Sequence, residues 1–329
     1  MATTQPSVPR TPFTRASAAR GTGTGNSRRD LRPSRTLRRG GRIAPLFVVP
    51  FFALFALVIL APIGYAAWMS VHQVHHSGLG FGPAKTVFSG LANFTTALDD
   101  PQFRSGFLVI ALYCLVLIPL TLGTGLMLAL LLDSSLARAR KLIQTGLFIP
   151  HAVPGVIAAM VWIYLYTPGI SPVVSALHGM GIPFNFLHLP SAAAGMINLS
   201  LWEGVGYNSL VFYAALQSVP REILEAARID GAGELRSAVS IKLPLIVGAV
   251  GVNGLFAVIA TLQLFTEPLF VSSSTPAISN TWTPLLYIYS AAFNRNDYGL
   301  ASAASLLLAA FTGALSFVAM RYVSRRRNR

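Results

Sequence analysis

Long apolar stretches limit the folds open to this sequence more than any other feature. Six of them, each about 20 residues long or somewhat longer, occupy approximately residues 46–70, 105–132, 145–166, 191–217, 245–270 and 300–323. A helix of this length crosses the hydrocarbon core of a bilayer. Strands do not fit, because the stretches do not alternate apolar with polar residues and are far longer than a barrel strand. The sequence therefore predicts an all-α, polytopic membrane protein with six transmembrane helices.

The composition agrees with a membrane location. Of the 329 residues, 53% are hydrophobic and 11% are charged, and this charged fraction is about half that of an average soluble domain. We expect the helices to tolerate Pro50, Pro62, Pro119 and Pro154, because a helix in lipid satisfies its backbone hydrogen bonds internally. The single cysteine, Cys114, excludes an internal disulfide.

The distribution of lysine and arginine predicts the orientation. With the N-terminus inside, the N-terminal tail, the segments 133–144 and 218–244 and the C-terminal end carry 22 of the 25 basic residues. Outside remain Lys85, Arg104 and Arg295. Because cytoplasmic loops are enriched in positive charge, both termini are expected in the cytoplasm.

The chain is expected to divide into a tail, a membrane domain and a short basic end. Residues 1–42 carry ten arginines against one acid, which predicts a disordered, Arg-rich cytoplasmic tail. Anionic membrane lipid is its favoured partner, and nucleic acid is the less favoured alternative. Residues 43–323 form the predicted six-helix domain, and 324–329 form a basic cytoplasmic tail.

One cytoplasmic loop, residues 218–244, carries a distinct pattern. Ser218 can cap a helix whose first turn suits Pro220, and a glycine-rich segment at 231–233 ends that helix. On it, Ile223, Ala226 and Ala227 share one face at helical spacing.

A second short helix is expected from about 234 to 241, before Pro244 opens the next span. Asp230 is unfavourable at the C-terminus of the first helix. Its position is explained if Asp230 caps the second helix or pairs with a cation on a partner. The loop is therefore predicted to be a pair of short helices that can enter a groove.

The loop also carries a family resemblance. The string Glu225-Ala226-Ala227-Arg228-Ile229-Asp230-Gly231-Ala232, followed by Ile241-Lys242-Leu243-Pro244, resembles the EAA loop of binding-protein-dependent ABC permeases. The stretches LWEGVGYNSLVFYAALQSVP, LQLFTEPLFVSSSTP and LLYIYSAAF resemble the sugar-permease branch, which includes maltose and glycerol-phosphate permeases. The similarity runs from about Pro45 to Tyr322. The chain departs from the family at Ala238, usually an aromatic, in lacking a proline soon after Pro244, and at Ser272, Ser273 and Ser274, where relatives tend to have glycines.

The resemblance implies a type I ABC importer permease of the bacterial inner membrane. In this family the EAA helices dock in a cleft of a separate ATPase subunit, which drives the permease between inward- and outward-facing states. The ATPase-coupling positions implied are Glu225, Ala226, Ala227, Asp230, Gly231 and Pro244. The implied partners are a second permease that forms a heterodimer with this chain, as is the family habit, two ATPase subunits and an extracytoplasmic sugar-binding protein. Judged without the resemblance, an ordinary amphipathic helix that packs on its own bundle is the simpler interpretation.

The chain cannot hydrolyse ATP itself. A Walker A loop needs Gly-Lys-Ser/Thr, and none of the three lysines, Lys85, Lys141 and Lys242, follows a glycine. Nor does the sequence contain a recognisable catalytic or zinc-binding constellation. We therefore expect no enzyme activity and no cofactor in this chain, with ATP and Mg²⁺ held by the partner ATPase.

Polar residues in the fourth and fifth stretches predict a substrate pathway. Glu203 and Tyr207 share a helix face, and the other candidates are Trp202, Asn208, Asn253 and Gln263. A sugar suits aromatic faces for its C–H surfaces and carboxylate or amide groups for its hydroxyls. The resemblance implies that Tyr207 matches a sugar-contacting aromatic. For Asn253 and Gln263, hydrogen bonding between helices is an equal alternative.

The sequence leaves two other functions and one other kind of site open. A proton-coupled secondary transporter would use Glu203 or Glu267 as its relay, and a membrane scaffold or sensor would use its arginine tails. The EAA loop argues against both. His72, His75 and His76 could place two imidazoles on one helical face, but an interfacial polar cluster is favoured over a metal site.

Overall fold

The computed structural model describes residues 48–75, 85–134, 139–167, 169–186 and 188–327. The predicted tail 1–42 and His76 lie outside these residues. The chain divides into two units, Met1–Leu57 and Val58–Arg329. The described residues are predominantly helical, so the predicted all-α class is confirmed.

The long helices agree closely with the apolar stretches. In the part of the chain that the structure describes, four helices are long and apolar enough to cross a membrane: Val48–Ser70, Pro101–Asp133, Glu234–Ser272 and Tyr298–Arg321. The first includes η1 (Ala56–Leu60) and α2 (Ala61–Ser70), the second is α4 (Pro101–Asp133), and the last lies in α14 (Tyr298–Arg327). Helix α8 (Ser191–Gln217) has the bounds predicted for the fourth stretch, but its polar residues keep it out of this group. The count of six spans therefore stays a prediction.

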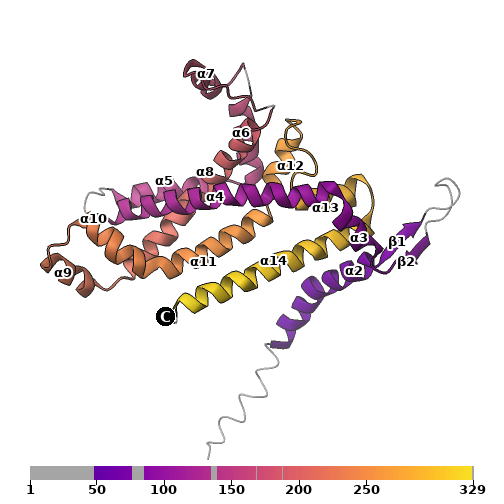
Figure 1. Cartoon of the computed structure of the whole chain (residues 1–329), viewed down its shortest axis with the longest axis horizontal. Coiled ribbons are helices and arrows are strands. Elements are labelled where there is room, and N and C mark those ends of the chain that lie inside the picture. The colour runs from indigo at the N-terminus through magenta and orange to yellow at the C-terminus, as the bar shows by residue number, and fades with distance from the viewer. Residues whose placement is uncertain (1–47, 76–84, 135–138, 168, 187, 328–329) are drawn as a thin grey trace, which may run out of the picture. The chain divides into compact units, whose positions relative to one another are not determined.

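The third apolar stretch is not one continuous helix, and this prediction is wrong. It forms α5 (Arg140–Ala152) and α6 (Gly155–Tyr166), which meet at 92° and can be followed in Figure 1. Val153 and Pro154 between them are extended, with ψ angles of 128° and 133°. Proline lacks a backbone N–H and restricts the residue before it, so Pro154 ends α5 instead of being accommodated. Helix α7 (Pro172–Gly179) follows α6.

A small hairpin follows α2 and was not predicted. Strands β1 (His72–His75) and β2 (Lys85–Phe88) pair antiparallel, with His72 opposite Phe88. The helix ends at Ser70, so the idea of two imidazoles on one helical face is wrong. The ring of His72 stacks on Trp68, with centroids 4.3 Å apart. Among the described residues, no group of three His, Cys, Asp or Glu side chains could hold a metal ion.

Helix α4 lies at the centre of the larger unit. It packs along α8 and also contacts α3 (Ala92–Asp99), α11 (Leu243–Leu262) and α13 (Pro284–Tyr289), as Figure 1 illustrates. A side chain added at Gly125 of α4 would meet Cβ of Asn208 at 2.9 Å, and one at Gly206 of α8 would overlap the carbonyl oxygen of Leu147 in α5. Small residues allow helices in membranes to approach this closely. Helix α8 is therefore packed closely against both α4 and α5 at these glycines.

The loop between α8 and α11 forms α9 (Arg221–Ile229), α10 (Glu234–Ser237) and the π-helical turn η2 (Ala238–Lys242). Ser218 does not cap α9: its hydroxyl donates to the carbonyl of Ala215 at the end of α8, and Pro220 is the N-cap residue. The second short helix, predicted from about 234 to 241, is not separate from the next span, because η2 joins α10 to α11 directly. The wider turn precedes Pro244, whose ring cannot continue a regular ladder of hydrogen bonds. Helix α12 (Thr266–Ser272) and the π-helical turn η3 (Ser290–Asn294) complete the described elements.

Candidate functional site

The EAA loop, residues 218–244, owes its shape to Gly231. This residue has a φ of +79°, a conformation that favours glycine. The N–H of Ala232 donates to the carbonyl of Ala227 at 2.9 Å, and that of Gly231 donates to Arg228 at 3.0 Å. These two bonds form a Schellman motif, which satisfies the last carbonyls of α9 and turns the chain sharply.

The coupling positions of α9 fall on two faces. Ala227 is buried, and Leu224 packs against an inner core that includes Phe212 and Ile246. Ala226 is exposed, so the predicted common face of Ile223, Ala226 and Ala227 is divided between bundle and solvent.

The exposed face of the EAA loop is partly apolar. Glu225, Ala226 and Asp230 are exposed. Ile229 is 87% exposed, and Leu235 of α10 is 79% exposed. Water makes such apolar exposure unfavourable unless another surface covers it. This face therefore has the character of an interaction surface.

Asp230 does not cap the second helix as expected, whereas Pro244 opens α11 as predicted. Asp230 is the C-cap residue of α9, while the N-cap residue of α10 is Gly233, which provides no side-chain cap. The interpretation of Asp230 as a cap for the second helix is therefore wrong, and contact with a partner stays a prediction. Pro244 is exposed in the first turn of α11.

A second candidate site is a cavity of about 270 Å³ inside the bundle. Its walls come from α4, α5, α8 and α11, and they include His151, Ser200, Tyr207, Asn208, Asn253, Phe256, Thr121 and Thr261. Tyr207 is half-exposed, and the ring of His151 stacks on it with a centroid separation of 4.7 Å. The lining thus combines aromatic faces with hydroxyl and amide groups.

Two asparagines connect the helices that border this cavity. Nδ2 of Asn253 in α11 donates to Oδ1 of Asn208 in α8, and Nδ2 of Asn208 donates to the carbonyl of Gly204 at 2.7 Å. Both side chains are buried. Asn253 therefore does make the hydrogen bond between helices that was the alternative to a substrate contact, although it also lines the cavity.

The other pathway candidates lie away from this cavity lining. Trp202 meets Trp162 edge to face with centroids 5.9 Å apart, and Gln263 is the exposed C-cap residue of α11. Glu203 meets the site through its main chain, because its carbonyl lies 3.3 Å from Nδ1 of His151. As substrate contacts, these three residues stay predictions.

Sequence reasoning missed His151 and Thr121. The partner of His151, Tyr207, is distant in the chain, so no local pattern connects the two residues, although the position of His151 just before Pro154 indicates a helix end. Thr121 is buried, and its hydroxyl has no hydrogen-bond partner among the described residues. An unpaired buried hydroxyl is costly, so its place in the cavity lining is consistent with a ligand contact.

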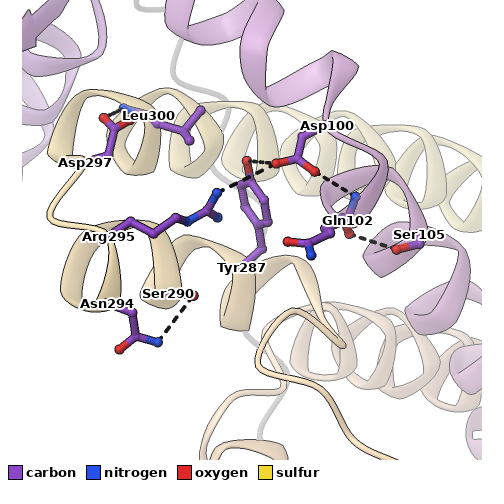
Figure 2. Close-up of polar contacts among 9 residues, drawn as sticks. All are labelled: Asp100, Gln102, Ser105, Tyr287, Ser290, Asn294, Arg295, Asp297 and Leu300. Atoms are coloured by element: carbon purple, nitrogen blue, oxygen red, sulfur yellow. Dashed lines mark hydrogen bonds and ion pairs between the residues drawn. The ribbon is translucent and has the colours of Figure 1, made fainter.

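A polar cluster surrounds the N-terminal end of α4 (Figure 2). Asp100, the N-cap residue, accepts hydrogen bonds from the N–H of Gln102 at 2.8 Å and from the hydroxyl of Tyr287 at 2.7 Å. Arg295 forms an ion pair with Asp100 at 3.9 Å and lies over the Tyr287 ring, 4.7 Å from its centroid. Burial, with Asp100 beside it, raises the pKa of Tyr287 to about 12. The cluster fixes α13 and η3 to α4.

Membrane-crossing helices around a mainly apolar cavity that contains a few amide and hydroxyl groups, with an exposed helical loop at one end, are typical of a membrane transport protein. The chain matches the model for binding-protein-dependent transport system inner membrane components over residues 121–329. The sn-glycerol-3-phosphate transport system permease protein UgpA of Yersinia pseudotuberculosis serotype I (strain IP32953) is 32% identical over 285 residues, covering 85% of this chain and 94% of the relative. UgpA of Escherichia coli O6:K15:H31 (strain 536 / UPEC) is 31% identical over 296 residues, covering 88% and 97%.

A solved structure has the same fold. It is a bacterial ABC transporter involved in the import of the acidic polysaccharide alginate, with a TM-score of 0.72 at 22% identity, covering 88% of this chain and 99% of that one. The chain therefore belongs to the family of binding-protein-dependent transport system inner membrane components. It is a permease subunit of an ABC importer in the inner membrane.

Proposed function

We propose that this permease carries a sugar or sugar-like solute from an extracytoplasmic binding protein into the cytoplasm, driven by a separate ATPase subunit. The observation that carries the proposal is the exposed apolar face of the EAA loop, with Ile229 87% exposed at the end of α9. The sequence contains no Gly-Lys-Ser/Thr loop, so the loop is where a hydrolysing partner would act. ATP and Mg²⁺ would be bound by that partner.

In this proposal the coupling residues divide their roles. Glu225, Ala226 and Asp230 would contact the ATPase, because all three are exposed. Ala227 would seat α9 on the bundle, and Gly231 would set the turn. Pro244 would mark the start of α11, through which a movement of the loop passes into the membrane.

The substrate would pass the cavity between α8 and α11. Tyr207 offers an aromatic face, Asn208 and Asn253 offer amides, and His151 and Thr121 add a ring nitrogen and a hydroxyl. Such groups suit the C–H faces and hydroxyls of a sugar. Trp202, Glu203 and Gln263 would serve other states or stages of the same pathway. The names of the relatives, a glycerol-phosphate permease and an alginate importer, fit a polyhydroxylated solute.

The proposed assembly follows from family membership. It contains this chain, a second permease that forms a heterodimer with it, two ATPase subunits and a sugar-binding protein. The chain would cross the membrane six times, with α8 as one span and both termini in the cytoplasm. The Arg-rich residues 1–42 would contact anionic lipid, and residues 43–323 would form the permease domain, followed by the basic end 324–329.

Uptake by the assembled complex in proteoliposomes tests the proposal. Glycerol 3-phosphate and a panel of neutral sugars are the probes, each supplied with the binding protein. Uptake that needs ATP inside, is inhibited by vanadate and resists uncouplers is the expected result. Sensitivity to uncouplers without a need for ATP would contradict it, and would favour a proton relay through Glu203 or Glu267.

A further inference from the structure

Asp133, the last residue of α4, connects the two ends of the EAA loop. Its Oδ1 accepts a hydrogen bond of 2.6 Å from Nε2 of Gln217, the last residue of α8. Its Oδ2 lies 2.5 Å from Nζ of Lys242, the last residue of η2. Gln217 directly precedes the loop and Lys242 ends its helical part. One carboxylate therefore holds both ends.

The electrostatics make this arrangement more than a surface ion pair. A carboxylate at a helix C-terminus is unfavourable by itself, because the free carbonyl groups there carry partial negative charge. The side chains of Asp133 and Lys242 are 13% and 18% exposed, so solvent screens their attraction weakly. Removing the charge of one would leave the other nearly buried and unpaired, which is strongly unfavourable.

Between its ends the EAA loop encloses space. A cavity of about 480 Å³ is lined by Asp133, Arg140, Arg228, Glu234 and Lys242 together with neighbouring residues. Val219 at the start of the loop belongs to the inner core, and Ser237 near its end is buried. The loop thus packs on the bundle near its two ends and through one face of α9, with a hollow beside that face.

We propose that Asp133 is a positioning residue that fixes both ends of the EAA loop to α4. A displacement of the loop is then delivered to α4 and α8 instead of being absorbed by bending at the loop ends. The inference rests on the proposed docking of an ATPase on the loop. Thr121 of the substrate cavity lies twelve residues before Asp133 on the same helix, about 18 Å away along its axis. One continuous helix therefore links the cavity to the contacts of Asp133 with Gln217 and Lys242, which we call the clamp.

Asp133→Asn in the assembled transporter tests the proposal. The amide keeps an acceptor for Gln217 but loses the charge that pairs with Lys242. We expect ATPase co-purification to be unchanged, amide hydrogen exchange of residues 217–242 to rise about tenfold, and uptake of glycerol 3-phosphate, or of the neutral sugar that is transported, to fall about five- to tenfold per ATP hydrolysed. The charge-reversed pair Asp133→Lys with Lys242→Asp should recover most of the lost coupling.

Asp99→Asn is the matched control, because it makes the same chemical change on an exposed side chain at the end of α3. Unchanged exchange in Asp133→Asn overturns the clamp. Faster exchange with unchanged uptake per ATP overturns the positioning role. If Ile229→Asp leaves ATPase binding and uptake intact, the docking assignment fails, while the exchange measurement still decides the clamp.

Discussion

The imidazole ring of His151 stacks on the phenol ring of Tyr207, with centroids 4.7 Å apart and planes inclined by 25°. His151 is near the end of α5, directly before the bend into α6, whereas Tyr207 is in the middle of α8. The pair forms part of one wall of the cavity that also contains Asn208 and Asn253. The bend at Pro154 therefore helps to place an aromatic surface in the cavity wall.

Tyr207→Ala should impair transport more than assembly. Loss of the ring removes an aromatic face from the cavity, and a stacking contact of this kind contributes about 1 kcal/mol or somewhat more, so KM for uptake should rise roughly tenfold. Uptake kinetics in proteoliposomes and co-purification of the ATPase are the two measurements. Tyr207→Phe, which keeps the stack on His151, is the control and should stay near wild type. If the ATPase is lost from Tyr207→Ala, the residue has a structural role instead.

Gly231→Pro and Glu225→Lys should abolish uptake while the protein still inserts in the membrane. Proline fixes φ near −65°, which is incompatible with the φ of +79° at Gly231, and the lysine reverses a charge on the exposed face of α9. Membrane fractionation and uptake assays check this. Gly248→Ala in α11 is a control, since a side chain there meets nothing within 4 Å. Wild-type transport by either loop variant would refute the coupling assignment.

Ile229→Asp should prevent stable binding of the ATPase. Its apolar side chain is 87% exposed, and burying it in a partner contributes about 1.5–3 kcal/mol, equivalent to at least a tenfold change in Kd. Affinity purification from membranes measures the ATPase retained. Met180→Asp, at an exposed apolar residue after α7, should retain the full amount. Equal retention by the two variants would speak against docking at the end of α9.

Tyr287→Phe should change how stability depends on pH. The pKa of Tyr287 is raised from 10 to about 12 in the folded protein, first by burial and then by Asp100. Its contribution is therefore present below about pH 10 and is lost as the pH rises towards 12. At pH 8 the variant should have a lower Tm, because Asp100 loses a hydrogen bond that contributes about 1.5–3 kcal/mol.

Thermal unfolding of the purified wild-type protein and of Tyr287→Phe, from pH 8 to 11, provides the measurement. The gap in Tm between the two proteins should narrow as the pH rises. A constant gap across that range would mean that the ionisation of Tyr287 does not couple to folding.

Sequence reasoning was most successful where one physical constraint dominates. The need for apolar helices in lipid located α8 to the residue and α4 within a few residues. It failed at Pro154, where the local restriction on the backbone outweighed the apolar pattern, and at the β1–β2 hairpin, where four-residue strands carry little periodic signal. The position of Gly231 was predictable from local chain chemistry alone.

Within the candidate sites, sequence reasoning failed for a different reason. The partnerships of His151 with Tyr207 and of Asp133 with Gln217 and Lys242 join residues that are distant in the chain. Their contact depends on the relative rotation of packed helices, which no local pattern specifies. Tyr207, Asn208 and Asn253 were named from polarity within an apolar stretch, but the same criterion also selected Trp202, Glu203 and Gln263, which lie elsewhere.

The close approach of Gly206 to the carbonyl group of Leu147 leaves no layer of rotatable side chains between α8 and α5 at that level. Sliding of these two helices past each other would force atoms to overlap. We therefore expect α5 and α8 to move together as one rigid body. Widening of the passage is then expected on another side of α8, such as the side that contacts α11. There, in the described part of the chain, the amide pair of Asn208 and Asn253 would act as a latch that is released and remade in every transport cycle.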